Sequence, residues 1–254
     1  MPLRHYIQGS IIALLFLLTG CITTTNAPER KIDLKKAEQT HVQAGLGYLR
    51  QKDKDSAQRH FLKALELNPN SAGAHNGLAL VYQMEEDPAQ AELHFSRAIA
   101  ADPDFSLARN NYAAFLFTAK RYTEAEQQLL RVVSDYTYER RDIALMNLGR
   151  TQMELEKFDA AITTLKQSIA VNFRLAQSHL ELADLYFQRE EYSSAKQYYD
   201  QFARLTRQTP RSLWLGIRIE HMLGNKDREA SLALALKNMH PKSDEYQLYK
   251  KNYE

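Results

Sequence analysis

Cysteine is almost absent from this chain of 254 residues, which contains a single one, Cys21. Because a disulfide needs two cysteines, none can form within the chain, and folding in an oxidising compartment must rely on packing alone. An excess of charge is also lacking, since the formal net charge is +2. Nucleic-acid binding calls for a concentrated basic face, so we expect no nucleic-acid partner and interpret Arg207 and Arg211 as solvated helix ends.

The chain also lacks the motifs of common catalytic and metal sites. It contains no HExxH, GxSxG or GxxxxGK sequence, and no further cysteine for a thiolate metal site. Among the histidines, we expect His75 and His179 to pack in the core. We expect His41, His60 and His94 to lie on partly exposed helix faces. The sequence therefore favours a protein that is not an enzyme and has no metal, cofactor or small-molecule substrate.

A long hydrophobic run is missing as well. A bilayer-spanning helix needs ~20 apolar residues, whereas Ile11–Leu18 has eight and follows a positively charged start, as in a signal peptide. The run ends in a tetrad that resembles the lipobox of bacterial lipoproteins, Leu18-Thr19-Gly20-Cys21. This resemblance implies that residues 1–20 are cleaved and that Cys21 carries covalent lipid such as palmitate. The alternatives are an ordinary secretory signal with a chance cysteine, or a buried core cysteine.

Residues 21–35 follow the lipobox and differ in composition from the rest of the chain. They are polar, contain Pro28 near the middle and show no sustained apolar period. Such a segment predicts a flexible linker. Since two or more acyl chains hold a protein on a membrane almost permanently, we expect a soluble domain on a lipid tether.

What the chain has in abundance is a repeat of 34 residues. Small residues, aromatic residues and a proline recur in the same order in two successive units: Gly45, Tyr48, Ala57, Phe61, Ala64, Pro69, and then Ala79, Tyr82, Ala91, Phe95, Ala98, Pro103. Ala113 and Ala125 continue the series. This pattern resembles the tetratricopeptide repeat, in which small residues lie where two helices cross and larger ones fill the space between units.

The resemblance implies an all-α solenoid of about six helix-turn-helix repeats wound into a right-handed superhelix. Within residues 36–242 we place the repeats at about 38–71, 72–105, 106–141, 142–175, 176–210 and 211–242, and a C-terminal capping helix at 243–254. Pro69 and Pro103 are expected to stop the second helix of the first two units. The sixth unit is the weakest match, because Arg218 stands at its small-residue position.

Stacked helix pairs form an extended concave surface that repeat proteins use for recognition. We predict a partner-binding groove lined by the first helix of each unit, with these residues: Val42, Leu46, Leu49, Asn76, Leu80, Asn110 and Phe117. An apolar lining with interspersed amides fits an amphipathic helix or an extended segment of another protein. Asn76 and Asn110 could bond both the N–H and the C=O of a bound backbone. Alternatively, Leu46, Leu80 and Phe117 pack between adjacent helices as core.

The C-terminal unit has a sequence of its own, from Ser212 to Gly224 around Trp214. This unit, the lipobox and the six repeats together resemble the type IV pilus biogenesis lipoproteins, the pilotin family called PilF or PilW. The resemblance implies an outer-membrane lipoprotein on the periplasmic face. In enteric-type bacteria an aspartate directly after the lipobox cysteine favours retention in the inner membrane, and this chain has Ile22 at that position. It implies binding of the pilus secretin subunit through the first repeats. It further implies a role in secretin localisation and multimer assembly, and hence in pilus biogenesis and twitching motility.

Two other functions stay open at this point. One is a general periplasmic scaffold lipoprotein, for example for cell-wall enzymes, and the other is an accessory lipoprotein for the assembly of outer-membrane barrels. In each case the partners are proteins and the outer membrane, and we expect the chain itself to be a monomer.

A substitution in the groove tests its assignment. Leu46→Asp or Leu80→Asp should abolish partner binding with little loss of thermal stability. An apolar ligand in the groove would bury the new carboxylate without a partner, which costs free energy. Pull-down of the partner and thermal unfolding measure the two effects. If both variants unfold, the two side chains belong to the core.

Overall fold

The computed structural model describes residues 33–253, and this part of the chain is made of α-helices without a strand. The predicted signal peptide, Cys21 and most of the predicted linker lie outside the described residues. The first helix begins at Leu34. The first helix pair therefore starts four residues before the expected position 38, and Leu34 and Lys35, assigned to the linker, are helical.

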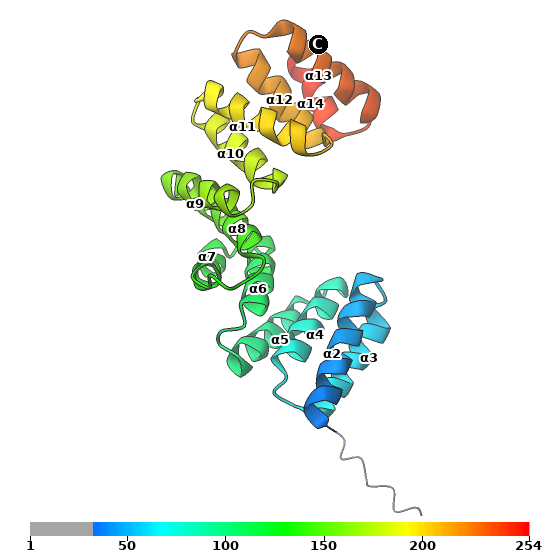
Figure 1. Cartoon of the computed structure of the whole chain (residues 1–254). Helices are drawn as coiled ribbons and strands as arrows, with labels where there is room; N and C mark the ends of the chain where they lie inside the picture. The colour runs from blue at the N-terminus through cyan, green and yellow to red at the C-terminus, as the bar shows by residue number, and fades with distance from the viewer. Residues whose placement is uncertain (1–32, 254) are drawn as a thin grey trace, which may run out of the picture. The chain divides into compact units, whose positions relative to one another are not determined.

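Twelve of the described helices form six consecutive pairs (Figure 1). We call the first helix of each pair the A helix and the second the B helix. The pairs are α2 (Leu34–Arg50) with α3 (Lys54–Leu67), α4 (Ala72–Met84) with α5 (Pro88–Ala101), α6 (Ser106–Thr118) with α7 (Tyr122–Val133), α8 (Arg141–Glu154) with α9 (Phe158–Val171), α10 (Ala176–Gln188) with α11 (Tyr192–Leu205), and α12 (Pro210–Met222) with α13 (Lys226–Met239). A last helix, α14 (Asp244–Tyr253), packs on α12 and α13. The predicted all-α solenoid is confirmed.

The turn from A to B helix has the same backbone conformation in every unit. One residue is left-handed, with φ between 57° and 61° at Lys52, Glu86, Lys120, Glu156 and Glu190, and 73° at Gly224. This conformation costs a non-glycine residue about 1 kcal/mol or more, and it ends the A helix. The six positions follow the repeat, so the turn is set by the register of the units and not by glycine.

The turn from B to A helix depends on a short polar side chain. A carboxylate or amide oxygen accepts the backbone N–H two residues later at 3.0–3.1 Å, at Asn68, Asp102, Asp135 and Asn172. The expected prolines, Pro69 and Pro103, follow only the first two of these. Such side-chain turns stop a helix because they offer the backbone an alternative partner. The third and fourth units therefore need no proline.

Glycine allows the closest helix contacts in the core. The ring of Phe61, which is fully buried, lies against Gly45 of its own unit and Gly77 of the next. A Cβ on Gly77 would lie 2.3 Å from this ring, and one on Gly216 would lie 2.3 Å from Tyr199. In the sixth unit the close approach to the preceding unit is thus made by Gly216. Arg218 is half-buried, and its guanidinium lies over the rings of Phe187 and Trp214.

Histidines join the A and B helices of the first two units. The Nδ1 atoms of His41 and His60 are 3.0 Å apart, and those of His75 and His94 are also 3.0 Å apart. The Nε2 of His75 is 3.1 Å from the carbonyl oxygen of Pro69, which can only accept. The Nε2 of His75 therefore carries its hydrogen and donates to Pro69. The Nδ1 of His75 accepts a hydrogen bond from the Nδ1–H of His94.

Burial differs among the histidines of the array. His75 is 6% exposed and His179 is 1% exposed, in accord with the predicted core positions. His94 is 7% exposed, so its expected place on a partly exposed face is wrong. Burial, together with smaller electrostatic contributions from His75 and Arg97, lowers the pKa of His94 to about 4. Tyr82 stacks on its ring, so His94 serves as a neutral packing residue.

Gly77→Ala should lower the free energy of unfolding by about 1–3 kcal/mol, because the new methyl group overlaps the buried Phe61 ring. The matched control is Gly47→Ala, where the added Cβ meets only the end of Arg50 at 3.8 Å. The control should raise stability by about 0.5–1 kcal/mol through helix propensity. Urea unfolding measures both changes, and a stabilising Gly77→Ala would contradict the packing described.

Stability should fall as the pH drops from 7 to 5. The unfolded chain protonates His94 near its ordinary pKa, whereas the folded chain keeps it neutral down to a pKa of about 4. The unfolded state then binds more protons, which costs the folded state about 2 kcal/mol at pH 5. His94→Gln should make the decline shallower. Equal declines in urea unfolding of both proteins across this range would show that His94 is not buried as a neutral group.

Candidate functional site

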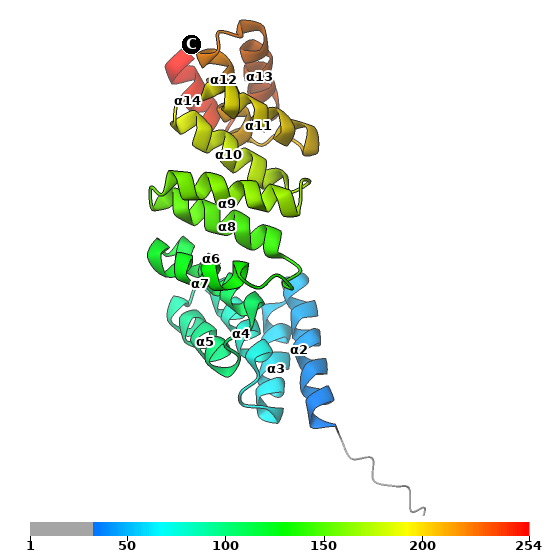
Figure 2. The same ribbon diagram turned by 60° about the vertical axis from the view of Figure 1, so that its left-hand side comes forward.

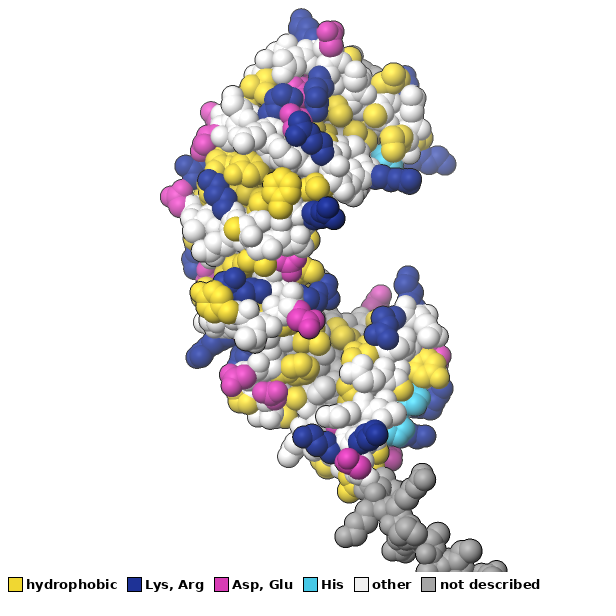
Figure 3. Space-filling model, in the orientation of Figure 1, with side chains coloured by type: hydrophobic (Ala, Val, Ile, Leu, Met, Phe, Trp, Pro, Cys, Tyr) yellow, Lys and Arg dark blue, Asp and Glu magenta, His cyan; other side chains and the backbone are white. Residues whose placement is uncertain are grey.

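The A helices form the inner side of the repeat array. Each A helix contacts the A helix of the next unit, whereas no B helix contacts the B helix of the next unit in the described array. Successive pairs stack along the chain (Figure 2). Because the B helices spread apart, the A helices line the concave face. In Figure 3 the surface is hollowed at mid-length, and apolar side chains reach it between charged ones.

The structure divides the predicted groove residues between core and surface. Val42 is 8% exposed and belongs to the core of the first two units, so its place in the groove is wrong. Leu46 and Leu49 are half-buried against the same core. Leu80 and Phe117 are half-buried against the core of the second and third units. These four side chains therefore both stabilise the fold and contribute surface to the concave face.

Asparagines of successive A helices form hydrogen bonds that we call the amide ladder. The Nδ2 of Asn111 donates to the Oδ1 of Asn76 at 3.1 Å, and the Nδ2 of Asn147 donates to the Oδ1 of Asn110 at 3.3 Å. Asn76 is only 2% exposed, so the prediction that it bonds a partner's backbone is wrong. Asn110, Asn111 and Asn147 are half-buried and lie nearer the surface.

A hollow of about 420 Å³ lies between α6, α7 and α8, and we call it the Phe117 hollow. The rings of Phe117 and Tyr122 meet edge to face, with centroids 5.2 Å apart. The guanidinium carbon of Arg150 lies 4.9 Å from the centroid of the Phe117 ring, a cation–π contact. Lys120, Asn147, Thr118 and Thr151 add further polar groups to the lining. The hollow thus offers an aromatic wall beside two cationic groups.

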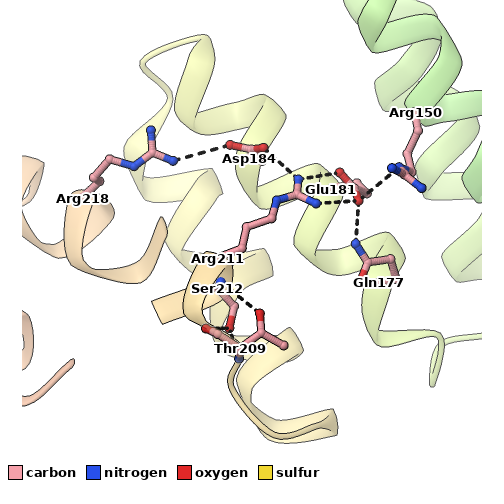
Figure 4. A network of polar contacts seen from close by, with 8 residues as sticks. All are labelled: Arg150, Gln177, Glu181, Asp184, Thr209, Arg211, Ser212 and Arg218. Atoms are coloured by element: carbon pink, nitrogen blue, oxygen red, sulfur yellow. Dashed lines mark hydrogen bonds and ion pairs between the residues drawn. The ribbon is translucent and has the colours of Figure 1, made fainter. Parts of the chain in front are cut away.

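A second hollow of about 440 Å³ shares Phe117 and Arg150 with the first and leads to a buried carboxylate, Glu181. Glu181 is 2% exposed. It accepts hydrogen bonds from Gln177 at 2.6 Å and from Arg211 at 3.0 Å, and Arg150 lies 3.5 Å away (Figure 4). Such partners offset the cost of burying a carboxylate, so removing one of them would be destabilising.

Arg211 and Arg218 extend this network along α12 (Figure 4). Burial disfavours the charge on Arg211, but the carboxylates of Glu181 and Asp184 outweigh it and raise the pKa of Arg211. Burial lowers the pKa of Arg218, against the opposing charge of Asp184 at 3.8 Å. A capping box of Thr209 and Ser212 starts the helix that carries both arginines. Arg211 is exposed in the first turn of α12, as expected for a solvated helix end, but it also pairs with Glu181 and Asp184 of the preceding unit.

The sequence contained a signal for this network that was overlooked. Asn111, Asn147 and Glu181 occupy equivalent positions, separated by 36 and 34 residues, on the inner face of successive A helices. A polar residue that recurs among apolar neighbours marks the concave face. The small and aromatic positions of the repeat do not by themselves point to this second series.

Within residues 33–253, no group of three or more histidine, cysteine, aspartate or glutamate side chains is arranged to hold a metal ion. No helix in the same part of the chain is long and apolar enough to cross a membrane.

Known proteins similar to this chain point to one family. Residues 42–104, 146–210 and 180–244 match a family described as tetratricopeptide repeat, and residues 82–137 match a second family of that description. The chain is 38% identical over 241 residues to the type IV pilus assembly protein PilF of Pseudomonas aeruginosa. The aligned residues cover 92% of this chain and 96% of that protein.

Solved structures agree with this similarity. The structure of Pseudomonas aeruginosa PilF matches with a TM-score of 0.80 at 38% identity, covering 86% of this chain and 98% of that one. PilW, described as a widely conserved type IV pilus biogenesis factor, matches with a TM-score of 0.76 at 26% identity, covering 83% and 97%. MamA, at 19% identity and a TM-score of 0.56 over 63% and 93%, shares the fold. The chain therefore belongs to the tetratricopeptide-repeat proteins of type IV pilus biogenesis, the family that includes PilF and PilW.

Proposed function

We propose that this protein is a pilotin, an outer-membrane lipoprotein that binds the type IV pilus secretin and promotes its outer-membrane localisation and multimer assembly. The observation that carries this proposal is the 38% identity to a type IV pilus assembly protein over 92% of the chain. The sequence Leu18-Thr19-Gly20-Cys21 supports the lipid anchor, because the lipobox cysteine is the residue that lipoproteins acylate.

The order of parts along the chain suits this role. Lipid on Cys21 would hold the protein at the periplasmic face of the membrane, since two or more acyl chains give an almost permanent anchor. The repeats that follow offer a concave face of apolar, amide and charged groups, which suits protein recognition better than chemistry on a small molecule. A secretin subunit bound there would be carried with the anchor. The protein then acts by binding and location, without catalysis.

Gene deletion tests the role in secretin assembly. Deletion in the source bacterium should remove secretin multimers from the outer membrane and abolish piliation and twitching motility. Immunoblots of membrane fractions and counts of surface pili measure this. Unchanged multimers and piliation would overturn the pilotin proposal and leave a general periplasmic scaffold as the better description.

Complementation of the deletion with Cys21→Ser separates location from recognition. This variant should fold and bind the secretin as the wild type does, yet fail to restore secretin multimers in the outer membrane. Mass spectrometry of the wild-type protein should find acyl chains on Cys21. An unmodified thiol, or full rescue by Cys21→Ser, would contradict the lipid anchor.

A further inference from the structure

The Phe117 hollow has an unbalanced charge. Lys120 and Arg150 are the charged residues in its lining, and within the described residues no carboxylate lines it. Lys120 lies in the left-handed turn after α6 and is exposed, and its ammonium group has no ion-pair partner in the described array. Two neighbouring acids contact residues of the lining: Glu181 lies 3.5 Å from the Nε of Arg150, and Glu154 is hydrogen-bonded to Tyr122. Because neither acid lines the hollow itself, its two cations favour an anionic ligand.

Arg150 has donors to spare. Its Nε lies 3.5 Å from Glu181, whose oxygens already accept closer hydrogen bonds from Gln177 and Arg211. The Arg150 guanidinium donates no hydrogen bond within residues 33–253, and stacking on Phe117 holds its plane. A guanidinium fixed in this way can bind a carboxylate through two parallel hydrogen bonds.

The rest of the lining fits a peptide. Phe117 and Tyr122 form an aromatic wall, and Leu129, which is 1% exposed, closes the floor. The Nδ2 of Asn147 is bonded within the amide ladder, but its Oδ1 has no partner in the described part of the chain and can accept a backbone N–H. The hollow therefore offers contacts for an apolar side chain, a backbone amide and a carboxylate together.

The hollow is open along the concave face on two sides. On one side lies the amide ladder, and on the other lies the second hollow, which shares Phe117 and Arg150. A bound main chain can continue in both directions, so the carboxylate is that of a side chain and not of a chain end. The second hollow is lined by four carboxylates and by two arginines, Arg150 and Arg211, so its negative excess would repel an acid. The acidic side chain is thereby directed to the Phe117 hollow.

We propose that the Phe117 hollow binds an extended internal segment of a partner protein, in which an aspartate or glutamate contacts Lys120 and Arg150 and a neighbouring apolar side chain packs on Phe117. This inference rests on the proposed function, because it takes the secretin as the partner protein. It places this contact at the junction of the third and fourth units, in addition to the contacts that the resemblance implies for the first repeats.

The chain supplies a matched pair of variants for the test. Lys120→Glu reverses one charge of the hollow, and glutamate already occupies the equivalent turn position at Glu86, Glu156 and Glu190, so the fold should not change. Lys52→Glu makes the same change at the same turn of the first unit, outside the hollow. Arg150→Gln removes the second cation. Circular dichroism and thermal unfolding check that all three variants fold.

The probes are fluorescent 15-residue peptides that tile the secretin sequence, and detergent-solubilised full-length secretin, measured against the full lipidated chain. We expect an acidic peptide to bind the wild type, and Lys120→Glu and Arg150→Gln each to raise its Kd about ten-fold. Lys52→Glu should leave the Kd within about two-fold. Changing the acid of the peptide to lysine should weaken binding to the wild type and restore binding to Lys120→Glu.

The outcomes separate this inference from the proposed function. If full-length secretin binds wild type, Lys120→Glu and Arg150→Gln equally well, the site is wrong while the pilotin role stands. The site is also wrong if Lys52→Glu weakens binding as much as Lys120→Glu. A peptide that binds only with a free terminal carboxylate would overturn the internal segment. If the secretin does not bind the wild type, both proposals fall.

Discussion

The packing of each B helix on the A helix that follows it is the contact on which the rest of the structure depends. A helix pair has apolar faces that it cannot bury alone, so each unit is completed by the next. In the first two units this contact is the Phe61 ring held between Gly45 and Gly77, and near the other end it is Tyr199 against Gly216. These contacts bring the A helices side by side while the B helices spread apart. The concave face follows from that difference.

The concave face combines two requirements that compete for the same side chains. Inner positions must join neighbouring units and must also leave groups available to a ligand. Leu46, Leu80 and Phe117 do both, because one side of each packs on the core while the other remains at the surface. The polar inner series shows the same division. The Oδ1 of Asn76 already accepts a hydrogen bond from Asn111. The Oδ1 of Asn147 and the guanidinium of Arg150 remain available to a partner.

The polar groups of the inner side change in kind from the first units to the last. The first units present half-buried leucines and paired histidines, the middle units present amides and the Phe117 hollow, and the later units contain buried Glu181 with its arginines. The charged Glu181 network therefore lies far along the chain from the apolar first units.

Local chemistry in the sequence was enough to predict the fold and the family. The 34-residue recurrence of small, aromatic and proline residues determines the helix pairs, because each position has a single place in the packing of a unit. It could not show which inner side chains a neighbouring helix covers. Val42, Asn76 and His94 are buried by residues 19 to 35 positions away, and Arg211 meets Glu181 of the preceding unit 30 residues earlier. Exposure and charge pairing arise from contacts between the helices of one unit, as at His94, or of successive units, as at Asn76 and Arg211, so only the tertiary structure decided them.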